Sequence, residues 1–182
     1  MSLHPSQSVY PVSENSEEEI ESILAVIVDN EPGTLARVVG LFSARSYNIE
    51  SLTVAETDGE KHRSRITIVT RGVPSTIEQI KAQLGRLIPV RRVSDVSREQ
   101  DALQRELALV KVVGEGEQRV EAMRMAEIFR ARAVDITHSS FVFEVTGARD
   151  KINAFLDLMR PLGLSDVART GVLSIRRGVL KD

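Results

Sequence analysis

Two short segments carry groups suited to holding a small charged molecule. One runs from Asp29 to Leu35 and reads Asp-Asn-Glu-Pro-Gly-Thr-Leu, and the other, Tyr47 to Leu52, reads Tyr-Asn-Ile-Glu-Ser-Leu. We expect the first to join a strand to a helix, since Pro32 presets φ for a helical turn and Gly33 lets a ligand approach the backbone. The first amides of a helix attract carboxylates because they are unpaired and lie at the positive end of its dipole. The two segments therefore suit capture of a free amino acid better than catalysis.

Both segments also have a simpler explanation. Asp29 or Asn30 can cap the following helix by accepting hydrogen bonds from its first amides. Asn-Glu-Pro-Gly is in any case a good turn sequence, and Asn48 is of a type common in left-handed turn positions. On local sequence alone, a plain turn and a binding site are both open.

Other groupings of reactive residues indicate little chemistry. Among the histidines, His4, His62 and His138, none has a second histidine or a cysteine at metal-ligand spacing, and the chain has no cysteine. His138 is followed by Ser139 and Ser140, but neighbours on a strand face opposite sides, so a short hairpin explains them better than a base beside a nucleophile. We therefore expect no catalytic residue and no metal site in this chain.

Two basic pairs, Arg63 with Arg65 and Arg91 with Arg92, lie on expected strands. Arginines on a strand can form a solvated rim of the sheet, or they can contact an acidic partner protein. The sequence favours neither explanation over the other.

The composition is that of a globular protein, with 42% hydrophobic and 27% charged residues among 182. A net charge of −2 gives no basis for nucleic-acid binding, and no apolar run approaches the ~20 residues of a membrane span. The absence of cysteine permits a reducing compartment, and we expect a cytoplasmic protein. Residues 1–21 are acidic and rich in serine, without the apolar stretch of a secretory signal, and we expect a disordered tail.

The rest of the chain reads as two copies of one unit. Residues 41–49 align with residues 128–136, sharing Phe, Ala, Arg and Ile, with Asn48 opposite Asp135. Apolar residues at helical spacing predict helices around residues 35–42, 77–87, 122–129 and 152–159. Strands are predicted at residues 23–28, 48–54, 65–70, 90–96, 107–113, 134–137, 141–146 and 167–175. The order is βαββαβ twice, with a junction at residues 97–102, which predicts two ferredoxin-like α+β domains with antiparallel sheets and helices on one face.

Each predicted sheet leaves one face and an edge in need of a partner. A unit of this size buries only a modest part of its surface, and an exposed strand edge is a template for pairing with another chain. Self-association is therefore expected.

The segment from Asn30 to Val54 resembles a known family. It reads Asn-Glu-x-Gly-x-Leu-x-Arg-Val-x-Gly-Leu-Phe-x-x-Arg-x-Tyr-Asn-Ile-Glu-Ser-Leu-Thr-Val, a pattern similar to the small regulatory subunit of acetohydroxyacid synthase (acetolactate synthase). Further matching blocks lie at residues 110–112, 127–130, 135–137 and 168–172. The resemblance extends over essentially everything after residue 21.

The resemblance implies an amino-acid-sensing ACT domain at residues 22–97 and a second ferredoxin-like domain at residues 98–182. It implies a subunit that is not an enzyme itself, binds no cofactor, and activates a catalytic large subunit carrying thiamine diphosphate, magnesium and FAD. It also implies feedback inhibition by valine, or another branched-chain amino acid, in branched-chain amino-acid biosynthesis.

In the resembled family, valine lies between the ACT domains of a homodimer. The matching positions would be Asn30, Gly33, Thr34, Leu35 and Ala36 of one chain with Asn48 and Ile49 of the other. The amides and the two asparagines would hold the charged ends of valine, and Leu35 and Ile49 would enclose its isopropyl group. The family usually has Gly where this chain has Ser46, a difference that bears on the placement of Asn48.

Two other functions fit parts of the sequence. A free-standing ACT-type sensor of another enzyme would share the first half of the chain. An RNA-binding domain can have the same strand order but needs stacked aromatic residues and a basic sheet, whereas only 4% of these residues are aromatic.

Overall fold

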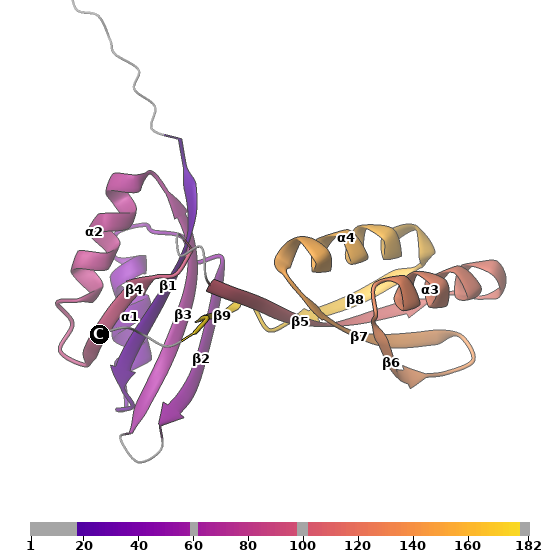
Figure 1. Ribbon diagram of the computed structural model, residues 1–182, viewed down its shortest axis with the longest axis horizontal. Coiled ribbons are helices and arrows are strands. Elements are labelled where there is room, and N and C mark those ends of the chain that lie inside the picture. The colour runs from indigo at the N-terminus through magenta and orange to yellow at the C-terminus, as the bar shows by residue number, and fades with distance from the viewer. Residues whose placement is uncertain (1–17, 59–61, 98–101, 179–182) are drawn as a thin grey trace, which may run out of the picture.

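The computed structural model describes residues 18–58, 62–97 and 102–178, which form two βαββαβ domains side by side (Figure 1). The first contains β1 (Ile20–Asp29), α1 (Thr34–Ser43), β2 (Ser51–Asp58), β3 (Arg63–Gly72), α2 (Pro74–Leu84) and β4 (Val90–Asp95). The second contains β5 (Ala102–Val113), α3 (Gly116–Ile128), β6 (Arg132–Ile136), β7 (Ser140–Gly147), α4 (Arg149–Met159), the 3-10 turn η1 (Arg160–Leu162) and β8 (Leu164–Arg169). A last strand, β9 (Leu173–Arg176), follows.

Both sheets have the strand order expected of a ferredoxin-like unit. The first is ordered β2-β3-β1-β4 and the second β6-β7-β5-β8, and every strand pair is antiparallel. Each pair of helices covers one face of its sheet (Figure 1). The predicted fold class is therefore confirmed.

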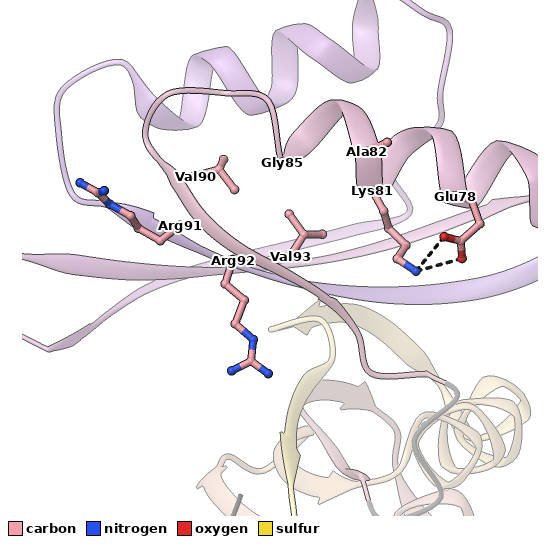
Figure 2. A pocket seen from close by; sticks show the side chains of 8 residues that line it. All are labelled: Glu78, Lys81, Ala82, Gly85, Val90, Arg91, Arg92 and Val93. Carbon is pink, nitrogen blue, oxygen red and sulfur yellow. Dashed lines mark hydrogen bonds and ion pairs between the residues drawn. The ribbon is translucent and has the colours of Figure 1, made fainter. Parts of the chain in front are cut away.

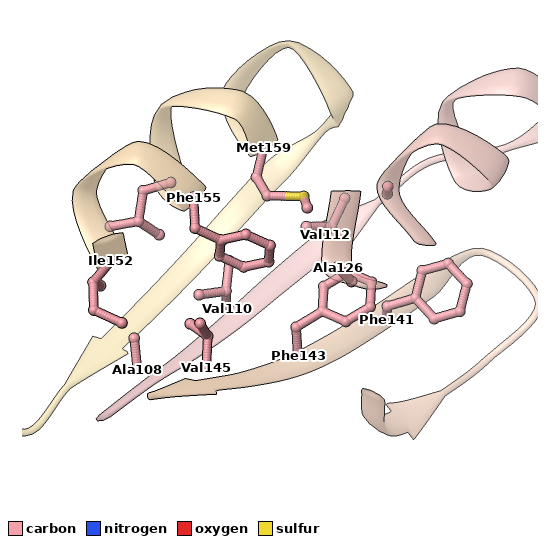
Figure 3. Close-up of a cluster of buried hydrophobic side chains, with 12 residues drawn as sticks. Ala108, Val110, Val112, Ala126, Phe141, Phe143, Val145, Ile152, Phe155 and Met159 are labelled. Carbon is pink, nitrogen blue, oxygen red and sulfur yellow. The ribbon is translucent and has the colours of Figure 1, made fainter. Parts of the chain in front are cut away.

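Each domain has its own apolar core between helices and sheet. In the first, alternate residues of β1 (Leu24, Val26, Val28) pack against Phe42 and the apolar stripe of α2. In the second, Phe141, Phe143 and Val145 of β7 pack against the inner face of α4 (Figure 3). The alternation along strands and the helical spacing predicted from the sequence are those observed, because burial of one face fixes the register.

Several predicted strand limits are wrong, and three of them show it most clearly. β2 begins at Ser51, not at Asn48, although Glu50 N–H already donates to Val69 O at 2.8 Å. β5 begins at Ala102 rather than at residue 107. The strand expected over residues 167–175 is broken, because Gly171 takes φ +79° between β8 and β9. The tail expected over residues 1–21 and the junction expected at 97–102 fall largely on residues 1–17 and 98–101, outside the described residues, and β1 already begins at Ile20.

The break at Gly171 returns the chain to the first domain. β9 pairs with residues 102–105 of β5, and this two-stranded ribbon lies against the sheet face that the helices leave open (Figure 1). Val172 is 3% exposed and packs with Ile23, Ala25, Val69 and Val96 of that face. Gly171 takes φ +79°, a conformation that favours glycine, and a Cβ there would lie 2.1 Å from Ser51 Oγ, so a larger residue would require the Ser51 side chain to move.

Charged groups join the two domains at a second place. The Arg149 guanidinium, at the start of α4, lies 2.5 Å from Glu21 Oε2 of β1 and 3.6 Å from Glu50 Oε2. Arg71 of β3 contacts the same two carboxylates, at 3.4 Å and 3.0 Å. We call Glu21, Glu50, Arg71 and Arg149 the inter-domain ion cluster.

No helix within the described ranges is long and apolar enough to cross a membrane.

Candidate functional site

The segment between β1 and α1 forms a tight turn held by its own backbone. Gly33 is the N-cap of α1 and takes φ +85°, a left-handed conformation that favours glycine. Thr34 is buried; its hydroxyl donates to Asp29 O at 3.2 Å, and its N–H donates to Glu31 O at 3.2 Å. The turn therefore holds the first residues of α1 in place.

The start of α1 is open to a ligand. In the described part of the chain, no side chain caps α1, and the N–H groups of Gly33, Leu35 and Ala36 have no hydrogen-bond partner. All three residues are exposed, Leu35 to 41%. The expected cap by Asp29 or Asn30 is wrong, because Asp29 binds Arg91 instead. A carboxylate placed here meets unpaired donors and the positive end of the helix dipole.

The Asn48–Ile49 segment lies just before β2, which is an edge strand of the first sheet. Asn48 is exposed, and its carbonyl accepts a hydrogen bond from Thr70 Oγ1 at 2.6 Å, which fixes the backbone there. Ile49 is half-buried and packs against the first core. The side-chain amide of Asn48 is thus presented at the edge of the sheet from a fixed backbone.

Several hollows of the described surface are not lined by these residues. One of about 400 Å³ lies between α2 and β4, where Lys81 Nζ is 2.9 Å from Glu78 Oε1 and the two charges satisfy each other (Figure 2). The predicted residues Asn30, Gly33, Thr34, Leu35, Ala36, Asn48 and Ile49 instead lie in two segments of the first domain, and all but Thr34 and Ile49 are exposed.

The remaining chemical candidates have structural explanations. Ser140 Oγ lies 2.7 Å from Thr137 Oγ1, and the Thr137 hydroxyl also accepts hydrogen bonds from the Ser139 and Ser140 amides. These contacts build the turn that contains His138. Among the described residues, no group of three or more His, Cys, Asp or Glu could hold a metal ion.

Comparison with known proteins places the chain in a family. Residues 24–92 match the model of an "AHAS small subunit-like ACT domain", and residues 105–178 match that of the "small subunit of acetolactate synthase". The probable acetolactate synthase small subunit of Archaeoglobus fulgidus is 46% identical over 85% of this chain and 96% of its own length. The isozyme 3 small subunit of Escherichia coli is 45% identical over 86% of this chain and 95% of its own.

The chain belongs to the acetolactate synthase small-subunit family. A solved member, the acetolactate synthase small subunit of Thermotoga maritima, is 34% identical and superposes with a TM-score of 0.79, covering 88% of this chain and 99% of that one. The resemblance seen in the sequence is thereby confirmed for both domains.

The position at which this small-subunit sequence departs from the family pattern has a left-handed backbone. Ser46 takes φ +57°, where a non-glycine residue costs about 1 kcal/mol. Tyr47 N–H then closes the end of α1 by donating to Phe42 O at 3.0 Å, and the Tyr47 ring packs edge-on against Phe42. The turn that presents Asn48 is therefore formed with serine in place of glycine.

One ion pair beside the site was not found from the sequence. Arg91 of β4 binds the Asp29 carboxylate, with Nε 2.9 and 2.8 Å from its two oxygens and Nη2 at 2.6 Å. The hydrogen bond from Arg91 holds the pKa of the Asp29 carboxyl below its ordinary value, and Arg63 contributes in the same direction. Only the pairing of β1 with β4 brings these residues together.

Replacing Arg91 with Gln is expected to raise the pKa of Asp29 to the ordinary range for aspartate. A lowered pKa means that the pair stabilises the fold at pH values above the ordinary aspartate pKa, and that this contribution is lost as the pH falls through the lowered value. Carboxyl NMR titration measures the change. Arg92→Gln is the control, since Arg92 extends away from Arg91 (Figure 2) and donates to Ser94 Oγ; an unchanged Asp29 pKa in Arg91→Gln would contradict the assignment.

Proposed function

We propose that this chain is a non-catalytic regulatory subunit that binds and activates the catalytic large subunit of acetolactate synthase in the cytoplasm. We also propose that it makes that enzyme sensitive to inhibition by valine. The observation that carries the second proposal is the pair of exposed patches, one with unpaired helix amides and one with Asn48 at a sheet edge. The cofactors of the reaction, thiamine diphosphate, magnesium and FAD, are assigned to the catalytic subunit.

The proposed valine site is completed by a second copy of the chain. Pairing of two first domains along their β2 edges would bring the α1 start of one chain to the Asn48 segment of the other. Free amides of Leu35 and Ala36 would take the valine carboxylate, with Asn30 and Asn48 at its charged groups. Leu35 is exposed and Ile49 half-buried, so both have apolar surface left to cover an isopropyl group.

A route for the signal runs through the inter-domain ion cluster. Glu50 directly follows Asn48 and Ile49, and it contacts both Arg71 of the first domain and Arg149 of the second. Valine bound at Asn48 would therefore lie two residues from a group that joins the domains. A difference of about 1–3 kcal/mol between two arrangements is enough for regulation of this kind.

Reconstitution tests the proposal. The purified chain is added to the catalytic subunit loaded with its cofactors, and acetolactate formation is followed with and without valine, leucine or isoleucine. We expect no activity from this chain alone, an increase in the activity of the catalytic subunit, and a decrease on addition of valine. Failure to bind the catalytic subunit, together with retained valine binding by calorimetry, would instead indicate a free-standing sensor.

A further inference from the structure

A groove at the junction of the two domains is lined by apolar residues that the fold leaves uncovered. The ribbon of β5 and β9 presents Leu103, Leu173 and Ile175 on one face, and Leu173 and Ile175 are 50% and 61% exposed. Opposite them lie Thr53 and Ala55 of β2, and the space between is about 300 Å³. We call the space lined by Thr53, Ala55, Leu103, Arg105, Leu173 and Ile175 the ribbon groove.

Arginines surround the ribbon groove. Arg105 lines it directly, and Arg92 lines an adjoining hollow of about 410 Å³ on the other side of Ile175. Figure 2 shows Arg92 extending from β4 away from Arg91. Arg91 is neutralised by Asp29, whereas Arg92 and Arg105 donate to the neutral acceptors Ser94 Oγ, at 3.1 Å, and Gln104 O, at 2.7 Å.

Within the described part of the chain, the charged residues that line the two hollows are all arginines. No Asp or Glu is among the described residues that line the two hollows, although the chain as a whole carries a net charge of −2. Exposed aliphatic side chains flanked by arginine are the composition of a protein-binding surface, where arginine is enriched. The second basic pair of the sequence thus divides: Arg91 forms an ion pair with Asp29 of its own chain, and Arg92 faces this surface.

The charge also selects the kind of occupant. A second copy paired through this same face about a two-fold axis would bring Arg92 and Arg105 against the same arginines, and like charges across an interface cost free energy. A single-stranded nucleic acid would need stacking aromatic residues, and neither hollow is lined by one; the net charge of −2 gives no basis for binding a duplex. An acidic polypeptide segment with aliphatic side chains would cover the apolar residues of the groove and pair its carboxylates with the arginines.

We propose that the ribbon groove, with Arg92 and Arg105, docks an acidic segment of the catalytic subunit. The inference rests on the proposed function, which supplies that partner. β5 belongs to the ribbon through residues 102–105 and to the second sheet through the rest of its length. A segment bound in the groove would therefore contact both domains at the place where their arrangement is fixed.

Charge reversal tests the docking surface. The variant Arg92→Glu/Arg105→Glu is titrated with the catalytic subunit in parallel with the wild type, as full-length chains. We expect the affinity to fall at least about tenfold, with slower association and a weaker dependence on salt, because the arginines steer an acidic partner. Arg92→Lys/Arg105→Lys, which keeps the charge, is expected to retain most of the binding.

Arg86→Glu is the matched control, since Arg86 is an exposed arginine of the same domain, in the turn between α2 and β4. Circular dichroism melting verifies that each variant is folded. Wild-type affinity in the charge-reversed variant overturns the docking surface and leaves the proposed function intact, whereas absence of binding by the wild type overturns the proposed function. A change of oligomeric state in the charge-reversed variant, measured by sedimentation, would assign the groove to a second copy and also overturn the proposal.

Discussion

Replacing Arg169 with Met is expected to lower the free energy of unfolding by about 3 kcal/mol. Arg169 of β8 binds the Glu106 carboxylate of β5 through two hydrogen bonds of 2.7 Å, and Glu106 is only 4% exposed. Methionine would leave that carboxylate buried without a counter-charge, which is the costly case for an ion pair. Because the Arg169 side chain is 30% exposed, solvent screens part of the effect. We therefore expect the low end of the range of destabilisation that is usual when one partner of a buried ion pair is removed.

Urea denaturation followed by circular dichroism measures this change. The double variant Glu106→Gln/Arg169→Met removes both charges and is expected to recover a large part of the lost stability. Arg160→Met is the matched control, because Arg160 forms an exposed pair with Asp157, three residues earlier on the surface, and such pairs contribute about 0–1 kcal/mol. Equal effects of Arg169→Met and Arg160→Met would show that the Glu106 pair contributes no more than a surface pair.

The hydrogen bonds to Glu106 also raise the pKa of Arg169. A raised pKa means that the folded protein favours the charged guanidinium, so this contribution is present at neutral pH and is lost only in strongly alkaline solution. The difference in stability between wild type and Arg169→Met is therefore expected to persist across the neutral range.

Replacing Asn48 with Ala is expected to raise the valine concentration needed for half-inhibition at least about tenfold. In the proposed site, the Asn48 amide binds a charged group of valine, and a hydrogen bond to a charged group contributes about 1.5–3 kcal/mol. The Asn48 carbonyl, which accepts from Thr70 Oγ1, is backbone and is retained. Activation of the catalytic subunit is therefore expected to stay close to that of the wild type.

Steady-state inhibition curves with the reconstituted enzyme measure the effect, and calorimetry of valine binding provides an independent check. Gln79→Ala serves as control, since Gln79 is an exposed amide on α2 of the same domain. Loss of activation together with valine response, in a folded Asn48→Ala variant, would contradict a separate sensing site.

Much of the fold could be predicted because each element carries its own apolar pattern. Phe141, Phe143 and Val145 alternate along β7, and Ile152, Phe155 and Met159 follow helical spacing along α4; all are buried as predicted. Limits of elements were less predictable. The apolar spacing of residues 167–175 does not reveal that the chain turns at Gly171 toward the first domain. That turn depends on the close approach of Gly171 to Ser51, which belongs to the other domain.

The place of the two candidate segments beside α1 and β2 was predictable from the sequence, but their contacts were not. The turn after β1 follows from local chemistry, whereas the left-handed φ of +85° at Gly33 was not predicted, since glycine was expected there for the approach of a ligand. The assignment of Asp29 as a helix cap was wrong because a competing partner, Arg91, lies 62 residues away in the sequence. Local propensity cannot include a charge brought in by another strand.

By itself, the sequence determined the family, the repeated βαββαβ order and the segments that carry the proposed valine site, because these depend on residue spacing within single elements. Only the tertiary structure decided which charges are paired and where the last strand lies. Arg65 Nη2 donates to Ser174 O across 109 residues, and Thr53 Oγ1 donates to Thr170 O across 117. Contacts of that separation depend on how the sheet faces and the returning chain pack together, which no local pattern encodes.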